Sequence, residues 1–234
     1  MYAVIEGIDT AGKSTQLNLL KSKYPKAIFT KEPGGTELGT KLRVMALNGE
    51  AKSKVAEMFL FMADRAEHIE QVIKPNKNNT IISDRSIISG IAYSTQLKID
   101  QLIELNLIAT DNTLPSHVIL LELTPEELKY RLSQKENDSI ELRGIDYLLN
   151  IQNRMKETIK KLNINYIFID ASLKIEEIGK PSKDNYTKVI SIKFDNQNDY
   201  NIKSYRQEEI RKESEQIWEK CGIYMIRTET KQED

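Results

Sequence analysis

The sequence predicts an α/β protein, a three-layer sandwich on a mostly five-stranded parallel sheet, with a small C-terminal appendage. Two observations predict the sandwich. Short apolar runs of strand character alternate with longer segments of helical periodicity along most of the chain. Polar motifs also follow the predicted strands, at the edge where a parallel sheet binds ligands. A chain of 234 residues is long enough to bury such a core without disulfides or structural metals.

Each expected element has its own signal. The five strands are apolar runs bounded by polar or turn residues, at residues 2–6, 27–30, 80–83, 117–123 and 166–170. The helices are periodic segments between them, at residues 14–23, 39–47, 52–74, 100–111, 125–134 and 142–162. Pro125 suits the first position of its helix, because the N–H group that proline lacks is not needed there. Such alternation is typical of a parallel sheet with helices on both faces.

The composition is that of an ordinary globular protein, with 39% apolar residues, 29% charged residues and a formal net charge of -1. A balance so close to neutrality argues against a general nucleic-acid or membrane-surface binder. Cys221 is the single cysteine, which suits a reducing compartment. Glu6 and Asp9 interrupt the apolar stretch that a signal peptide needs, and no later apolar run approaches the ~20 residues of a membrane span. We therefore expect a cytoplasmic protein without nucleic-acid or membrane partners.

The first bend of the chain carries the strongest motif. Residues 7–14 read GIDTAGKS, which fits GxxxxGK[ST], and they follow a predicted strand and open a predicted helix, as the phosphate-binding loop of a P-loop NTPase requires. Backbone N–H groups and the helix N-terminus would hold the phosphates of a nucleoside triphosphate, with Lys13 at the β and γ phosphates. A plain glycine turn is the alternative, and the flanking strand and helix argue against it. The residues predicted to bind the triphosphate are Gly7, Thr10, Ala11, Gly12, Lys13, Ser14 and Thr15.

Two acids and an arginine follow the ends of predicted strands. An acid beside bound phosphates is unfavourable unless it faces another partner, so we expect Asp9 to face an acceptor hydroxyl or a cation. Asp84 is placed to hold Mg²⁺ opposite Ser14, and Arg85 to neutralise charge on a transferring phosphoryl group. A capping aspartate with a salt-bridged arginine is the alternative. The predicted catalytic residues are Asp9, Lys13 and Arg85, and the predicted magnesium ligands are Ser14 and Asp84.

Two further segments indicate a second substrate site. TKEPGGTELGTKLR, at residues 30–43, combines a proline, adjacent glycines and a helix start. In EMFLFMADRAEH, at residues 57–68, Phe61 and Arg65 are four apart and share a helix face. A ring and a guanidinium so placed are suited to stack on a base and clasp a phosphate. A strand-to-helix turn, and a core phenylalanine beside a surface arginine, are the respective alternatives.

Together these segments resemble thymidylate kinase, a family of the P-loop nucleoside monophosphate kinase group. The resemblance rests on EGIDTAGKST, EPGGTELG with Leu42 and Arg43, LFMADRAEH and DRSIISGIAYS, in this order, and it extends to about Ile178. It implies that the chain transfers a phosphoryl group from MgATP to dTMP, giving dTDP. It also implies a homodimer.

The resemblance implies roles for single residues. Phe61 would stack on thymine, Asp9 would lie near the sugar 3′-hydroxyl, and Tyr93 would fill the space of a 2′-hydroxyl. The peptide bond before Pro33 is left open as cis or trans. The guanidinium groups expected around the dTMP phosphate are those of Arg43, Arg65 and Arg85, and the hydroxyls expected near the base are those of Ser89 and Ser94. The predicted substrate-binding residues are Asp9, Glu32, Pro33, Arg43, Phe61, Arg65, Arg85, Ser89 and Tyr93.

Several positions depart from the family's pattern. Ser86 follows Asp-Arg where many members have tyrosine, and Lys31 precedes EPGGT where arginine is common. The phosphate loop supplies no arginine, and Ser139 stands where arginine is common in the expected lid, residues 133–144. The remaining candidates for the lid's catalytic positive charge are Arg131, Lys135 and Arg143.

Residues 179–234 follow the expected kinase domain of residues 1–178. They contain strand-like segments at 188–194 and 223–227 and a charged, helix-like segment near 204–220. A packed appendage, a partner-binding element and poorly ordered sequence are the three interpretations. Two other functions stay open: another nucleoside or nucleotide kinase, and a non-catalytic nucleotide-binding regulator that acts through residues 179–234.

Overall fold

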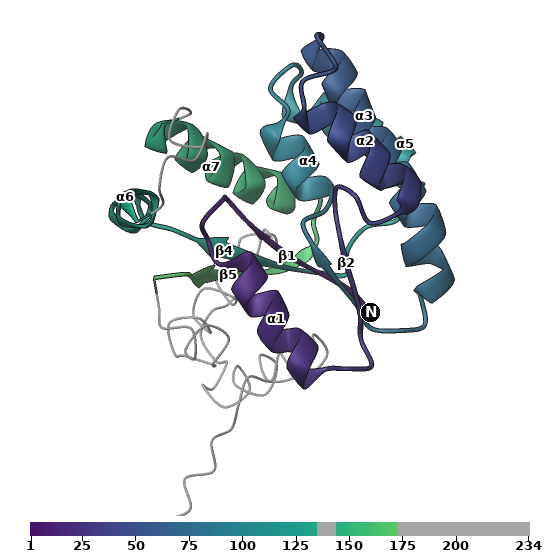
Figure 1. The fold of residues 1–234 in the computed structure, drawn as a ribbon, viewed down its shortest axis with the longest axis horizontal. Coiled ribbons are helices and arrows are strands. Elements are labelled where there is room, and N and C mark those ends of the chain that lie inside the picture. The colour runs from purple at the N-terminus through teal and green to yellow at the C-terminus, as the bar shows by residue number, and fades with distance from the viewer. Residues whose placement is uncertain (135–143, 173–234) are drawn as a thin grey trace, which may run out of the picture.

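The computed structural model describes residues 1–134 and 144–172, which form a sheet covered by helices (Figure 1). The strands are β1 (Tyr2–Gly7), β2 (Ile28–Lys31), β3 (Ile81–Asp84), β4 (His117–Glu122) and β5 (Asn165–Asp170). They lie in the order β2-β3-β1-β4-β5, and every neighbouring pair is parallel. The predicted parallel sheet is confirmed, and each predicted strand boundary agrees to within one residue.

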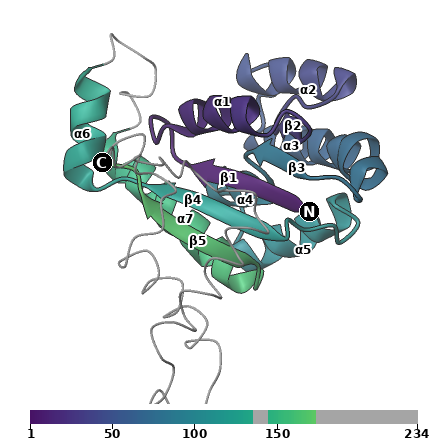
Figure 2. The same ribbon diagram turned by 90° about the horizontal axis from the view of Figure 1, so that it is seen from below.

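Helices cover both faces of the sheet, which confirms the three-layer sandwich. Helix α1 (Lys13–Lys23) lies on one face, and α4 (Ile87–Tyr93), α5 (Ile99–Ala109) and α7 (Ile145–Lys161) lie on the other (Figures 1 and 2). Helices α2 (Glu37–Leu47) and α3 (Lys54–His68) pack against each other, and α6 (Pro125–Ser133) lies beside the β4 and β5 strands (Figure 1). None of the described helices is long and apolar enough to cross a membrane.

Two regions differ from the expected helices. Helix α4 was not expected, because Ile87–Tyr93 is too short to show helical periodicity and contains Gly90. The helix expected at residues 52–74 is α-helical only over α3, and it continues as a π-helical turn, Ile69–Ile73, and a 3₁₀ turn, Lys74–Asn76. Pro75, inside that last turn, has no N–H group with which to continue an α-helix.

The core places three strand ends together. Strand β1 is central in the sheet and buried along its whole length, so its carboxyl end is fixed by neighbours on both sides. The register pairs Ile5 with Asp84, and Asp84 with Lys31. Because the strands are parallel, the segments that follow β1, β2 and β3 emerge at one edge of the sheet. These segments contain the motifs that the sequence assigns to the two nucleotide sites.

Three predictions fall on residues outside the described ranges. They are the lid residues Lys135, Ser139 and Arg143, the first residues of the helix expected from residue 142, and the strand and helix character of residues 179–234. The helix expected at 142–162 is α7, which begins at Ile145.

Candidate active site

The loop between β1 and α1 is shaped to surround an anion. Gly7 and Gly12 have φ angles of 154° and 92°, which L side chains rarely adopt. A Cβ atom on Gly7 would also lie only 2.9 Å from the carbonyl oxygen of Leu121. Gly12 is the N-cap of α1 and offers no side chain to its first N–H groups. Those N–H groups, at the positive end of the helix dipole, remain available to phosphate oxygens.

Lys13 points back into this loop. Its Nζ donates to the carbonyl oxygens of Gly7 at 2.9 Å and Ile8 at 3.0 Å, and the residue is 8% exposed. Burial, and to a lesser extent the Arg85 guanidinium, lower the pKa of Lys13 to about 8, although the nearby carboxylates oppose the shift. A bound phosphate would favour the charged ammonium. The lysine is therefore suited to bind phosphate oxygens.

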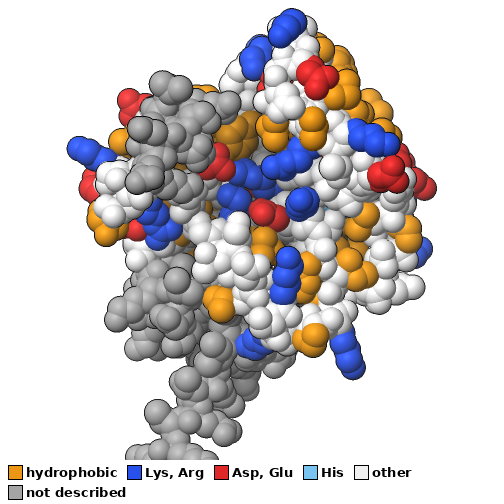
Figure 3. Space-filling view, viewed as in Figure 1, with side chains coloured by type: hydrophobic (Ala, Val, Ile, Leu, Met, Phe, Trp, Pro, Cys, Tyr) orange, Lys and Arg blue, Asp and Glu red, His pale blue; other side chains and the backbone are white. Residues whose placement is uncertain are grey.

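Two adjoining cavities open at the carboxyl edge of the sheet. The first has a volume of about 590 Å³ and the second about 420 Å³. Figure 3 shows lysine and arginine side chains gathered around a hollow in this face. The residues that line both cavities are all charged: Asp9, Glu32, Arg43 and Arg85. Two anionic groups, one in each cavity, would meet at this shared wall.

The second cavity contains most of the residues predicted to bind ATP and magnesium. These are Thr10, Gly12, Lys13, Ser14, Thr15 and Asp84, and the cavity is also lined by Asp9 and Lys31. Gly7 and Ala11 do not line it, and Ala11 is fully buried. The Oδ1 atom of Asp84 is buried and has no hydrogen-bond partner among the described residues. A lone carboxylate oxygen opposite a helix-terminal Ser14 hydroxyl suits Mg²⁺, which combines one or two protein ligands with phosphate oxygens.

The first cavity contains every residue predicted to bind the second substrate. These are Asp9, Glu32, Pro33, Arg43, Phe61, Arg65, Arg85, Ser89, Tyr93 and Ser94. Phe61 is half-buried and presents an aromatic surface in this cavity. Tyr93 is also in its wall, and burial raises the pKa of its hydroxyl, so that the group stays protonated. The cavity therefore combines an aromatic surface with positive charge, as a nucleotide site requires.

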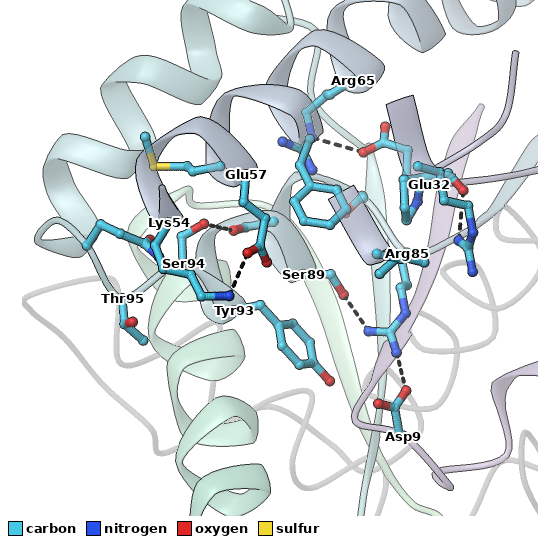
Figure 4. A pocket seen from close by; sticks show the side chains of 18 of the residues that line it. Asp9, Glu32, Lys54, Glu57, Arg65, Arg85, Ser89, Tyr93, Ser94 and Thr95 are labelled. Atoms are coloured by element: carbon cyan, nitrogen blue, oxygen red, sulfur yellow. Dashed lines mark hydrogen bonds and ion pairs between the residues drawn. The ribbon is translucent and has the colours of Figure 1, made fainter. Parts of the chain in front are cut away.

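Arg85 lies between the two cavities in a constrained conformation. It has a φ angle of 66°, which is uncommon for a residue other than glycine, and Ser83 Oγ donates to its carbonyl oxygen at 2.8 Å. Its Nη2 pairs with Asp9 Oδ1 at 2.6 Å, and its Nη1 donates to Ser89 Oγ at 3.0 Å (Figure 4). The guanidinium also lies over the ring of Tyr93, 5.4 Å from its centroid. Three neighbouring groups thus hold the guanidinium at the wall shared by both cavities, and Ser83 holds the backbone of the same residue.

Arg65 is more deeply buried, at 4% exposure. Its Nε pairs with Glu32 Oε2 at 2.9 Å, and its Nη1 donates to Asn106 Oδ1 at 2.6 Å. It lines only the first cavity. Two of its three nitrogens are therefore engaged by protein groups, and Arg43 and Arg85 are better placed for a phosphate at the shared wall.

The segment that follows β2 is held by a buried ionic network. Glu32 also pairs with His68 Nδ1, at 2.9 Å through Oε1. Burial would raise the pKa of Glu32, but the charges of Arg65 and His68 and their hydrogen bonds outweigh it and lower the pKa. The Glu32–Pro33 peptide bond is cis, and the Pro33 carbonyl accepts a hydrogen bond from Arg43 Nη1 at 3.0 Å. This network fixes Glu32 and Arg43 in the shared wall.

The sequence patterns did not indicate several residues that line the cavities or hold their side chains in place. Gln96 lines the first cavity, and its Oε1 is buried without a partner among the described residues. Tyr147 lines the same cavity from α7, far along the chain. Asn106 orients Arg65, and Glu6 accepts hydrogen bonds from Ser86 and Ser89. An acid inside an apolar strand was the available signal for Glu6.

Arg131 is the one lid candidate within the described residues. Its Nε donates to Glu127 Oε1 at 2.6 Å, its Nη1 donates to the Thr10 carbonyl oxygen at 3.0 Å, and its Nη2 donates to the carbonyl oxygen of Ala171. It is not among the residues that line either cavity. In this arrangement Arg131 connects α6 to the phosphate loop.

Comparison with known proteins agrees with this geometry. The family model described as thymidylate kinase matches residues 5–180. Thymidylate kinase of Aliarcobacter butzleri is 78% identical over 184 residues, which are 79% of this chain and 97% of that protein. That of Wolinella succinogenes is 57% identical over 178 residues, covering 76% and 94%. The crystal structure of thymidylate kinase from Ehrlichia chaffeensis matches with a TM-score of 0.56 at 26% identity, covering 72% of this chain and 91% of that one. This chain belongs to the thymidylate kinase family.

Proposed function

We propose that this chain transfers the γ-phosphoryl group of ATP to dTMP, with Mg²⁺ as cofactor, and that the two cavities hold the two nucleotides head to head. The observation that carries the proposal is the charged wall that the cavities share. Phosphoryl transfer needs two anions aligned and positive charge spread around the moving group. Arg43 and Arg85 supply that charge at the junction.

The second cavity holds the donor. Backbone N–H groups of the phosphate loop and the N-terminus of α1 bind the phosphates, and Lys13 binds the β and γ groups. Ser14 and Asp84 would hold Mg²⁺, and the ion would neutralise phosphate charge. Thr15 completes this turn of the helix in the cavity wall.

The first cavity holds dTMP. Phe61 stacks on the base, Tyr93 fills the space of a 2′-hydroxyl, and the polar side chains of Ser94 and Gln96 lie in the same wall. Arg43 and Arg85 bind the phosphate, and Arg65 presents its remaining N–H groups to the nucleotide. We expect the sugar 3′-hydroxyl to lie near Asp9, which pairs with Arg85 and lines both cavities.

The chemistry asks for no protein nucleophile, because a phosphate oxygen of dTMP attacks the γ-phosphorus directly. The chain's part is to align the two nucleotides and to stabilise the charge on the moving group. Lys13 and Arg85 stabilise that charge.

We also propose a homodimer formed through helices α2 and α3. Their outer faces carry large apolar side chains that are between 39% and 60% exposed: Leu38, Val44, Met45, Leu47, Val55 and Phe59. An apolar face of this kind is typical of a protein interface.

We further propose that the enzyme acts in the cytoplasm, and that residues 179–234 are an extension of the kinase domain, residues 1–178.

A coupled assay of ADP formation tests the proposal. The purified protein with MgATP is offered dTMP, dUMP, thymidine, CMP and AMP in parallel. We expect saturable ADP formation with dTMP and a lower kcat/KM with every other acceptor. Turnover with another acceptor but not with dTMP would assign a different kinase activity. ATP binding without turnover on any acceptor would favour a nucleotide-binding regulator.

A further inference from the structure

Glu6 is a buried acid beneath the active site that the proposed reaction does not use. It lies in the central strand β1, is 0% exposed and lines neither cavity. Its carboxylate accepts hydrogen bonds from Ser86 Oγ at 2.7 Å, Ser89 Oγ at 2.5 Å and the Ser89 backbone N–H at 3.4 Å. It makes no ion pair with any residue in the described ranges.

A carboxylate in this position is costly for the fold. Removal from water disfavours the charged form, and burial raises the pKa of Glu6, while Ser89 and Ser86 lower it by donating hydrogen bonds. An apolar side chain of similar volume would fill the same space in the strand without this cost. The packing of β1 therefore does not explain why an acid occupies this position. Its role must involve the groups that it binds, Ser86 and Ser89.

Ser89 connects Glu6 to Arg85. The hydroxyl has one hydrogen, which it donates to Glu6 Oε2, so an oxygen lone pair is left to accept from Arg85 Nη1 at 3.0 Å. Asp9 accepts from the other terminal nitrogen of the same guanidinium (Figure 4). The guanidinium is thus held between two acceptors, and one of them is oriented from below by a buried charge.

We propose that Glu6 is a positioning residue for phosphoryl transfer, which acts through the Ser89 hydroxyl to fix the Arg85 guanidinium at the wall between the two nucleotide cavities. Ser86 supports the same arrangement. Its Oγ donates to Glu6 Oε1 and also accepts from Ile88 N at 3.3 Å, at the first turn of α4. Glu6 thereby ties β1 to the helix that carries Ser89. The inference rests on the proposed kinase reaction.

A double-mutant cycle of Glu6→Gln and Ser89→Ala tests this relay. The amide is close in shape to the carboxylate but lacks the charge and the second acceptor oxygen, and alanine removes the hydroxyl that Arg85 needs. We expect each single variant to lower kcat for dTMP about tenfold, with the KM for dTMP changed less than threefold. In the Ser89→Ala background, Glu6→Gln should lower kcat less than twofold further, because the relay is already broken.

Gln152→Leu is the control for a purely structural effect. Gln152 is buried and bridges the backbone of Leu123 by two hydrogen bonds, at 2.9 and 3.1 Å, outside both cavities. We expect this control to lower the Tm and leave kcat within twofold of the wild type.

Three results would overturn the relay: effects of the two substitutions that multiply, a Glu6→Gln variant that loses Tm but keeps kcat, or a Ser89→Ala variant with a raised KM and unchanged kcat. The Ser89→Ala result decides the question even where Glu6→Gln does not fold. If the wild type itself does not phosphorylate dTMP, the proposed function fails instead, so the two failures are distinguishable.

Discussion

Gly90 lies in a helix, where alanine is normally preferred, but it packs against the Arg65 side chain in the active site, which leaves no room for a methyl group. It lies inside α4, where alanine would ordinarily stabilise the helix by about 0.5–1 kcal/mol relative to glycine. A Cβ atom at Gly90 would lie 2.8 Å from both Cζ and Nη1 of Arg65, and closer still to Nη2. The guanidinium would have to move.

The cost of that movement follows from the partners of Arg65. The side chain is 4% exposed and is held by Glu32 at 2.9 Å and Asn106 at 2.6 Å, so it has no open space to enter without losing one of them. A hydrogen bond to a charged group contributes about 1.5–3 kcal/mol. After the helix gain is subtracted, Gly90→Ala should destabilise the protein by roughly 1–2 kcal/mol. For a chain of this size, this corresponds to a fall in Tm of about 2–8 °C.

Thermal unfolding and dTMP kinetics measure the two consequences together. Because Arg65 lines the first cavity, we expect the KM for dTMP to rise about fivefold or more and the KM for ATP to stay within twofold. Gly49→Ala is the matched control. Gly49 has a φ angle of 69° but nothing within 4 Å of its missing Cβ, so alanine there should cost about 1 kcal/mol of stability and leave both KM values unchanged. A Gly90→Ala protein with the wild-type Tm and the wild-type KM for dTMP would refute the reasoning.

Four further predictions concern the two nucleotide sites and the dimer. Lys13→Ala should lower kcat about 10²-fold or more, because the cation at the β and γ phosphates is lost; near-wild-type turnover would reject its role. Phe61→Ala should raise the KM for dTMP about tenfold with ATP binding unchanged, as measured by initial rates and calorimetry, and an unaltered response to dTMP would contradict stacking. Asp84→Asn should raise the Mg²⁺ concentration needed for half-maximal ATP affinity several-fold, in a titration followed by calorimetry; an unshifted midpoint would remove Asp84 from the metal site. Phe59→Arg should convert the proposed homodimer to monomers in light scattering, and a monomeric wild type would refute that proposal.

The fold was predictable because its signals are local. Each strand is a short apolar run, and the phosphate loop is recognised from a motif of consecutive residues. Helix α4 was missed for the opposite reason. Its seven residues show little helical periodicity. Gly90 inside them is needed because a Cβ atom there would clash with Arg65 on α3, and not because the helix favours glycine. The extent of α3 was overestimated because apolar spacing continues through the π-helical turn at Ile69–Ile73.

The members of the candidate site were predictable, but their contacts were not. The spacing of Phe61 and Arg65 predicted a shared helix face, and both line the first cavity, yet nothing near them in the chain indicates that Asn106, 41 residues away from Arg65, holds the guanidinium. Ser89 was expected near the base, and its hydroxyl is engaged by Glu6 and Arg85. Hydrogen-bond partners of this kind depend on how helices pack on the sheet, which residue spacing does not encode.

The arginines at the shared wall are paired with protein groups but keep N–H donors that can bind the phosphates of two nucleotides. Arg85 has five N–H donors, and Asp9 and Ser89 accept one each, so three remain for phosphate oxygens. Arg43 likewise gives one N–H to the Pro33 carbonyl and keeps the others. Because the protein partners already fix both cations, little ordering is left to be done when the phosphates bind. The acids at this wall therefore act with the arginines rather than against the substrates: Asp9 holds Arg85, Glu32 holds Arg65, and each arginine keeps N–H donors that these acids do not use.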